Sequence, residues 1–71
     1  MEIGESIIWR RPSEELPPLI IEALDNLKKK HGEGPFQITK IIEAPDKIDV
    51  EFVNKNGEKV VLYSRWFEEA L

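Results

Sequence analysis

The sequence predicts a mainly β domain of the α+β class, in which a small, strongly bent antiparallel sheet carries one helix. Apolar and polar residues alternate over residues 48–53, and a turn sequence at 54–57 leads into a second apolar run at 58–63. Apolar residues also recur at helical spacing over residues 18–30. With 71 residues and no cysteine, the chain is expected to be a single domain, residues 1–71, stabilised by apolar burial without disulfides.

The first half of the chain is expected to hold one strand and the helix. Residues 5–10 form the strand, with Ile7 and Trp9 on the same face because side chains alternate along a strand. The helix over residues 18–30 begins at a proline, which suits the first helical position because no amide N–H is needed there. It ends before Gly32, a residue that readily takes the positive φ of a helix C-cap. This helix is inserted in the long first loop of the sheet.

The second half is expected to contribute most of the sheet. The neighbouring residues Ile41 and Ile42 interrupt the alternation of the first of its strands, which indicates either a β-bulge or burial on both faces. The expected elements are strands over residues 36–43, 48–53 and 58–63, a short helical turn over 64–67 and a terminal strand over 68–71.

The turn at residues 54–57 sets the register of the central hairpin. A type I turn with a left-handed Gly57 pairs Phe52 with Val60, whereas a two-residue turn would pair Phe52 with Val61. We favour the first register, because asparagine suits the opening position of such a turn and glycine its closing position.

Several short segments together resemble the SH3-like small barrels, which include the KOW-type modules of translation and transcription proteins. The resemblance covers most of the chain outside residues 12–31, which lie where such barrels carry their long first loop. It implies a small antiparallel barrel whose repertoire is peptide docking or nucleic-acid contact. The segments are Ile3-Gly4-Glu5, Gly34-Pro35-Phe36 with Ile38 and Ile41, Val50 with Phe52, Asn56-Gly57, and Leu62 followed by Arg65-Trp66-Phe67-Glu68.

Charge and the amino terminus limit the classes of partner and location. The formal net charge of −4 opposes a general affinity for phosphate backbones, which depends on clustered lysine and arginine. Residues 1–5 show no basic region followed by a long apolar run, so we expect neither a secretory signal nor a membrane anchor. The expected location is cytoplasmic, with no membrane partner.

The sequence does not predict an enzyme. The single histidine, His31, lies at a lysine-rich helix end, a position that the helix dipole explains without catalysis. The pair Gly32 and Gly34 lacks the third glycine and the following helix of a dinucleotide loop. We therefore expect no catalytic residue, no cofactor and no metal ligand.

Aromatic residues beside arginines provide the candidate binding surface. Tryptophan, tyrosine and arginine dominate the energetics of protein interfaces, and strand 5–10 and the helical turn can lie close together in a barrel. For each tryptophan, filling the core of so small a domain is the alternative. The candidate partner-binding residues are Trp9, Arg10, Arg11, Tyr63, Arg65 and Trp66.

These observations favour a noncatalytic interaction module that binds a protein partner. A nucleic-acid or ribosome-associated protein is the first alternative, because arginine beside an aromatic ring also holds single strands and residues 28–30 are lysines. A structural subunit of a homo-oligomer is the second, because Val61 and Tyr63 would lie on the outer face of the hairpin.

Overall fold

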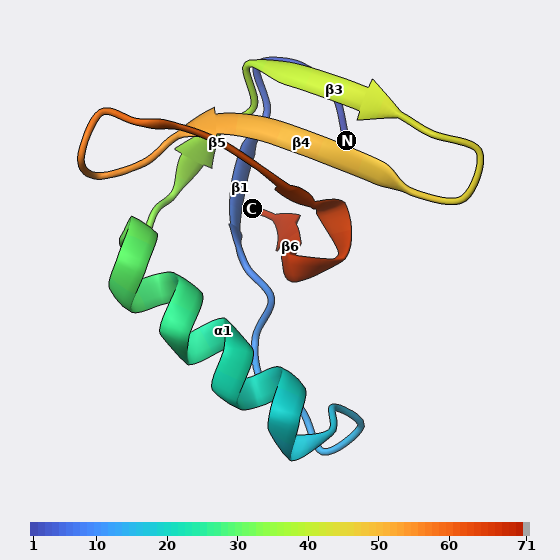
Figure 1. Cartoon of the computed structure of the whole chain (residues 1–71), viewed down its shortest axis with the longest axis vertical. Helices are drawn as coiled ribbons and strands as arrows, with labels where there is room; N and C mark the ends of the chain where they lie inside the picture. Colours follow the sequence, from blue (N-terminus) through green and yellow to red (C-terminus); the bar gives the residue numbers. More distant parts are fainter. Residues whose placement is uncertain (71) are drawn as a thin grey trace.

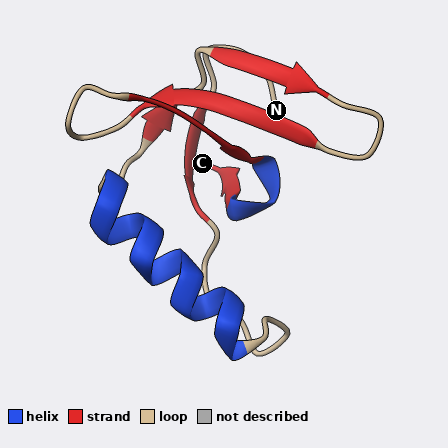
Figure 2. Cartoon of the chain, viewed as in Figure 1, coloured by secondary structure: helices blue, strands red, loops and turns tan. Residues whose placement is uncertain are grey.

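The computed structural model describes residues 1–70, which form one helix and two three-stranded antiparallel sheets (Figures 1 and 2). The strand orders are β2-β1-β6 and β3-β4-β5, and no pairing within residues 1–70 closes them into a barrel. The α+β class is confirmed. The elements are β1 (Ser6–Trp9), α1 (Pro18–His31), β2 (Phe36–Gln37), β3 (Lys40–Glu43), β4 (Ile48–Val53), β5 (Lys59–Tyr63), the 3₁₀ turn η1 (Ser64–Trp66) and β6 (Phe67–Glu69).

The prediction of one strand over residues 36–43 is wrong, because the chain changes sheets within it. Ile38 exchanges backbone hydrogen bonds with Gly4 and Glu5, whereas the N–H of Thr39 donates to the carbonyl of Glu51 in the other sheet. Lys40 also pairs with Glu51, so two residues oppose one, as in a β-bulge. The irregularity therefore precedes Ile41 and Ile42, which pair with β4 without interruption.

The predicted register of the β4–β5 hairpin is confirmed. Phe52 pairs with Val60, and Gly57 has a φ of +79° at the end of the turn. The side-chain oxygen of Asn54 accepts hydrogen bonds from the backbone N–H groups of Asn56 and Glu58, at 2.9 and 3.0 Å. Asparagine at the opening position thus organises the turn that follows it.

The remaining element boundaries differ from the prediction by one or two residues. Strand β1 is one residue shorter at each end than predicted, β5 begins one residue later, and α1 extends one residue further. The helical turn ends at Trp66 because Phe67 has an extended backbone and pairs with Trp9 as the first residue of β6. The predicted terminal strand therefore starts earlier and ends at Glu69, and its last residue, Leu71, lies outside the described residues.

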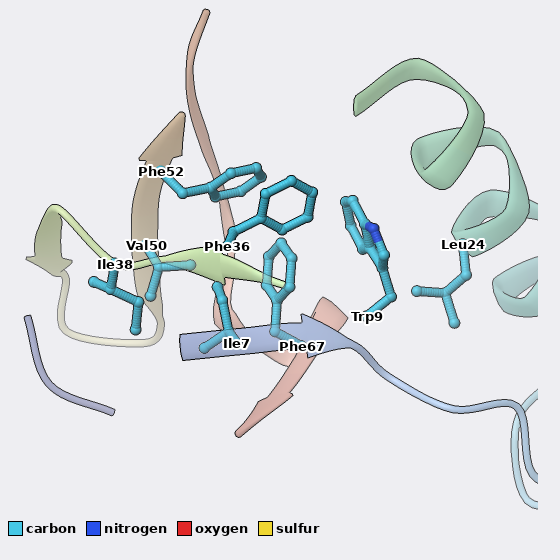
Figure 3. Close-up of a cluster of buried hydrophobic side chains, with 8 residues drawn as sticks. All are labelled: Ile7, Trp9, Leu24, Phe36, Ile38, Val50, Phe52 and Phe67. Atoms are coloured by element: carbon cyan, nitrogen blue, oxygen red, sulfur yellow. The ribbon is translucent and has the colours of Figure 1, made fainter. Parts of the chain in front are cut away.

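The core is an aromatic cluster between the two sheets, with the helix on one side (Figure 3). The rings of Phe36 and Phe52 lie 4.5 Å apart, and those of Trp9 and Phe67 stack at 4.6 Å. Figure 3 shows Trp9 between the phenylalanine rings and Leu24 of α1. The buried apolar residues are Ile7, Trp9, Leu24, Phe36, Ile38, Val50, Phe52 and Phe67.

Polar contacts attach the carboxyl end of α1 to this core. The indole N–H of Trp9 donates a buried hydrogen bond of 2.7 Å to the carbonyl of Gly32. His31 is only 7% exposed, and its Nδ1 lies 3.0 Å from the side-chain nitrogen of Asn54. Since the amide nitrogen of asparagine can only donate, Nδ1 accepts, and the neutral imidazole carries its proton on Nε2. No helix among residues 1–70 has the length and apolar character needed to cross a membrane.

Replacing Trp9 by phenylalanine tests the indole hydrogen bond. Trp9→Phe keeps an aromatic ring but leaves the buried carbonyl of Gly32 without its donor, so we expect the free energy of unfolding to fall by about 1–3 kcal/mol. Urea denaturation followed by circular dichroism measures this change. Leu19→Ala is the control, because Leu19 is 78% exposed and its replacement should change stability by less than about 0.5 kcal/mol. Equal midpoints for the two variants would contradict the prediction.

The burial of His31 predicts a pH-dependent stability. Burial lowers the pKa of His31 below its usual 6.5, the charge of Lys30 lowers it further, and Glu58 acts in the opposite direction. As pH falls below 6.5 the unfolded chain therefore binds a proton before the folded one does, so the free energy of unfolding decreases until the folded-state pKa is passed.

Urea denaturation across this pH range checks the effect. His31→Gln should remove part of the slope, since glutamine does not titrate but retains a hydrogen-bond acceptor. An unchanged slope in His31→Gln would assign the pH dependence to other groups.

Candidate partner-binding cavity

Four of the six predicted binding residues line one cavity of about 230 Å³. Arg10, Tyr63, Arg65 and Trp66 form one part of its wall. The rest of the wall consists of Leu16, Ile20 and Leu24, which precede or belong to α1. The cavity therefore lies between the helix and the region where β1 ends and η1 begins.

Backbone pairing brings the two arginines of the cavity together. The N–H of Arg10, directly after β1, donates to the carbonyl of Trp66 at 2.8 Å, and Arg65 precedes Trp66 in η1. Tyr63 ends β5 immediately before this turn. Residues more than fifty positions apart in the sequence thus line the same, mostly apolar hollow.

The opposite wall is apolar. Ile20 and Leu24 are four residues apart within α1, which places both side chains on one face of the helix, and Leu16 lies just before the helix begins. Leu24 is buried, whereas Leu16 and Ile20 are half-buried and pack against the core. The sequence analysis did not identify Leu16 as a site residue. The sequence did contain a signal for Leu16, because this apolar residue lies four positions before Ile20, on the other side of the two prolines.

The arginines of the cavity differ from Arg11 in their electrostatic surroundings. Arg10 and Arg65 are exposed, and neither forms an ion pair with an aspartate or glutamate within residues 1–70. Arg11, in contrast, contacts Glu68 through an ion pair of 2.8 Å and two hydrogen bonds. The cavity is therefore lined by two cationic residues that form no ion pair within the described part of the chain, although the charge of Arg10 also acts on Glu68 and lowers the pKa of its carboxyl.

The other two predicted residues lie outside this cavity. Trp9 is 3% exposed and belongs to the core, which is the alternative that the sequence left open for each tryptophan. Arg11 lines a separate hollow with Ile8 and Glu68. The backbone N–H of Arg11 holds the pKa of the Glu68 carboxyl below its usual range, and its guanidinium acts in the same direction. Arg11 is thus already occupied by a partner within the chain.

The polar groups near the core form contacts within the fold. His31, the only imidazole, is buried against Trp9 and Phe52 and bonded to Asn54. Within residues 1–70, no group of three or more histidine, cysteine, aspartate or glutamate residues could hold a metal ion. Lys55 donates from Nζ to the carbonyl of Lys29 at 3.2 Å, so one lysine beside the basic helix end caps that end.

Comparisons of this chain with protein-family models, with curated proteins and with solved structures gave no match. The similarity to SH3-like barrels therefore stays a prediction.

The different burial of the two tryptophans predicts unequal quenching of their fluorescence. Trp66 is half-buried at the cavity, whereas Trp9 is enclosed in the core. Acrylamide should therefore quench the wild-type protein more strongly than Trp66→Phe, in which only Trp9 emits. Circular dichroism of Trp66→Phe provides the control for folding. Equal quenching constants would place Trp66 out of reach of the solvent and contradict the assigned site.

Proposed function

We propose that this domain is a noncatalytic interaction module that binds a protein partner through the cavity between α1 and η1. The observation that carries the proposal is the convergence of Arg10, Tyr63, Arg65 and Trp66 on one partly apolar hollow. Tryptophan, tyrosine and arginine are the residues most enriched among interface hot spots, particularly around pockets that exclude water. A volume of about 230 Å³ also suits a side chain of a partner better than a drug-sized ligand, which typically needs about 300 Å³ or more.

The order of elements supports an SH3-like arrangement as part of this proposal. One strand, a helical excursion, a bent antiparallel sheet, a 3₁₀ turn and a final strand follow one another along the chain. In this arrangement the excursion supplies one wall of the binding site, through Leu16 and Ile20, instead of a flexible loop. The peptide-docking repertoire of such barrels is consistent with the cavity.

Nucleic-acid binding is the competing interpretation, and the charge distribution disfavours it. Only two cationic side chains line the cavity. Binding of a single strand depends on a positive groove that follows several phosphates. The net charge of −4 adds repulsion at longer range.

Selection of peptides on the immobilised domain tests the proposal. Peptides enriched from a random phage-displayed library should bind wild-type protein and Arg11→Ala equally well. They should lose about tenfold or more in affinity for Trp66→Ala, because truncating a central aromatic residue typically costs at least 2 kcal/mol. Circular dichroism establishes whether Trp66→Ala is folded. Arg65→Glu provides a second variant, since the exposed position of Arg65 makes its replacement compatible with folding.

Two results would reject a protein partner at this site. One is a selection whose peptides bind Trp66→Ala and Arg65→Glu as well as wild-type protein. The other is the absence of selected peptides together with quenching of Trp66 by mixed-sequence single-stranded RNA that weakens steeply with salt, which would assign nucleic-acid binding.

A further inference from the structure

Two arginines that line the cavity, Arg10 and Arg65, indicate the charge of the partner. The chain has 14 acidic residues, yet no carboxylate within residues 1–70 lies within ion-pair distance of Arg10 or Arg65. The neighbouring Arg11 shows that the same region can supply a carboxylate, since Glu68 binds it through both side chain and backbone. Among residues 1–70, Arg10 and Arg65 thus form no ion pair, and both line the apolar hollow.

The backbones of Arg10 and Arg65 lie close to one another in the fold. The hydrogen bond from the Arg10 N–H to the Trp66 carbonyl places Arg10 beside the residue that follows Arg65. Both side chains also line the hollow whose opposite wall is formed by Leu16 and Ile20. A group that enters the hollow therefore meets a mostly apolar wall, and two of the residues that line it, Arg10 and Arg65, are exposed and cationic.

The size of the hollow indicates one large side chain. A cavity of about 150 Å³ is sufficient to hold benzene, and this cavity measures about 230 Å³. A phenylalanine or leucine side chain fits that space, with the backbone of its segment remaining outside. The arginines then face the residues that flank this side chain in the sequence of the partner.

We propose that the cavity recognises an acidic peptide segment in which one bulky apolar residue is flanked by aspartate or glutamate. The apolar side chain enters the hollow against Leu16, Ile20 and Trp66. The flanking carboxylates bind Arg10 and Arg65, whose planar guanidinium groups match a carboxylate through paired hydrogen bonds. This inference rests on the proposed function, and it specifies the chemistry of the partner.

Charge complementarity separates this occupant from a basic or neutral one. A lysine or arginine beside the apolar residue would leave both guanidinium groups unpaired and add like-charge repulsion. A neutral segment would fill the hollow but leave the two charges without a partner. An acidic segment satisfies both parts of the site.

Four capped synthetic peptides test the inference. The first contains one phenylalanine with two aspartates on each side. In the second the aspartates are asparagines, in the third they are lysines, and in the fourth the phenylalanine is alanine. Titration is followed by tryptophan fluorescence, compared with that of Trp66→Phe, and by amide chemical shifts in NMR spectra. These shifts establish whether contact is confined to residues such as Leu16, Ile20 and Trp66.

The acidic peptide should bind most tightly, with amide shifts at the cavity. The asparagine peptide should bind about threefold to tenfold more weakly, the range expected from two exposed charge pairs. The alanine peptide should lose about tenfold or more through the lost apolar contact. Arg10→Ala and Arg65→Ala should each reduce affinity for the acidic peptide about threefold and leave affinity for the asparagine peptide unchanged. Arg11→Ala is the matched control and should behave as wild type.

Equal or tighter binding of the asparagine or lysine peptide at the cavity would overturn the acidic specificity and leave the proposed function standing. Failure of all four peptides, with library-selected peptides still bound at the cavity, would overturn the inference in the same way. Binding of the acidic peptide to Arg10→Ala and Arg65→Ala with wild-type affinity would also overturn it.

Discussion

The hydrogen bond between the Trp9 indole and the Gly32 carbonyl is the contact on which the arrangement of this domain depends. Trp9 lies in the middle strand of one sheet, and Gly32 follows the last residue of α1. A buried carbonyl without a donor would be costly, so this bond fixes the helix end relative to the strand. The same indole stacks on Phe67 and lies near His31, which is in turn bonded to Asn54 in the β4–β5 turn. One side chain thereby connects the helix, both sheets and the hairpin.

This attachment leaves the two ends of α1 in different environments. Polar contacts between the helix end and the rest of residues 1–70 involve Lys29, His31 and the adjoining Gly32. The first turn of the helix is less enclosed, because Ile20 is half-buried and Leu19 is 78% exposed, whereas Leu24 in the middle of the helix is buried. A segment with few buried contacts opens more readily than a packed one. The helix can therefore form a cavity wall that adjusts to its occupant while its carboxyl end stays fixed.

Local signals predicted the helix and the hairpin, whereas long-range contacts determined the rest. The turn at Asn54 depends on its own side chain, so the hairpin register could be predicted from a few residues. The change of sheet at Ile38 depends on bonds to Gly4 and Glu5, more than thirty residues away, and leaves no local pattern. The two tryptophans each stand beside arginine in the sequence, so composition could not separate the buried Trp9 from Trp66. Four of the six candidate residues line one cavity, and their role in binding a partner stays a prediction that rests on interface composition.

The contrast between net and local charge constrains the proposed partner further. The domain carries a net charge of −4, so a strongly acidic partner is repelled at long range even though Arg10 and Arg65 attract carboxylates at contact. At physiological ionic strength the screening length is about 8 Å, which limits the attraction to carboxylates adjacent to the apolar anchor. Additional acidic residues farther along the segment would lie beyond the reach of these two arginines and would be opposed by the net negative charge of the domain. Under the proposed specificity, the site should therefore favour a few carboxylates close to one apolar side chain over long acidic tracts that lack such an anchor.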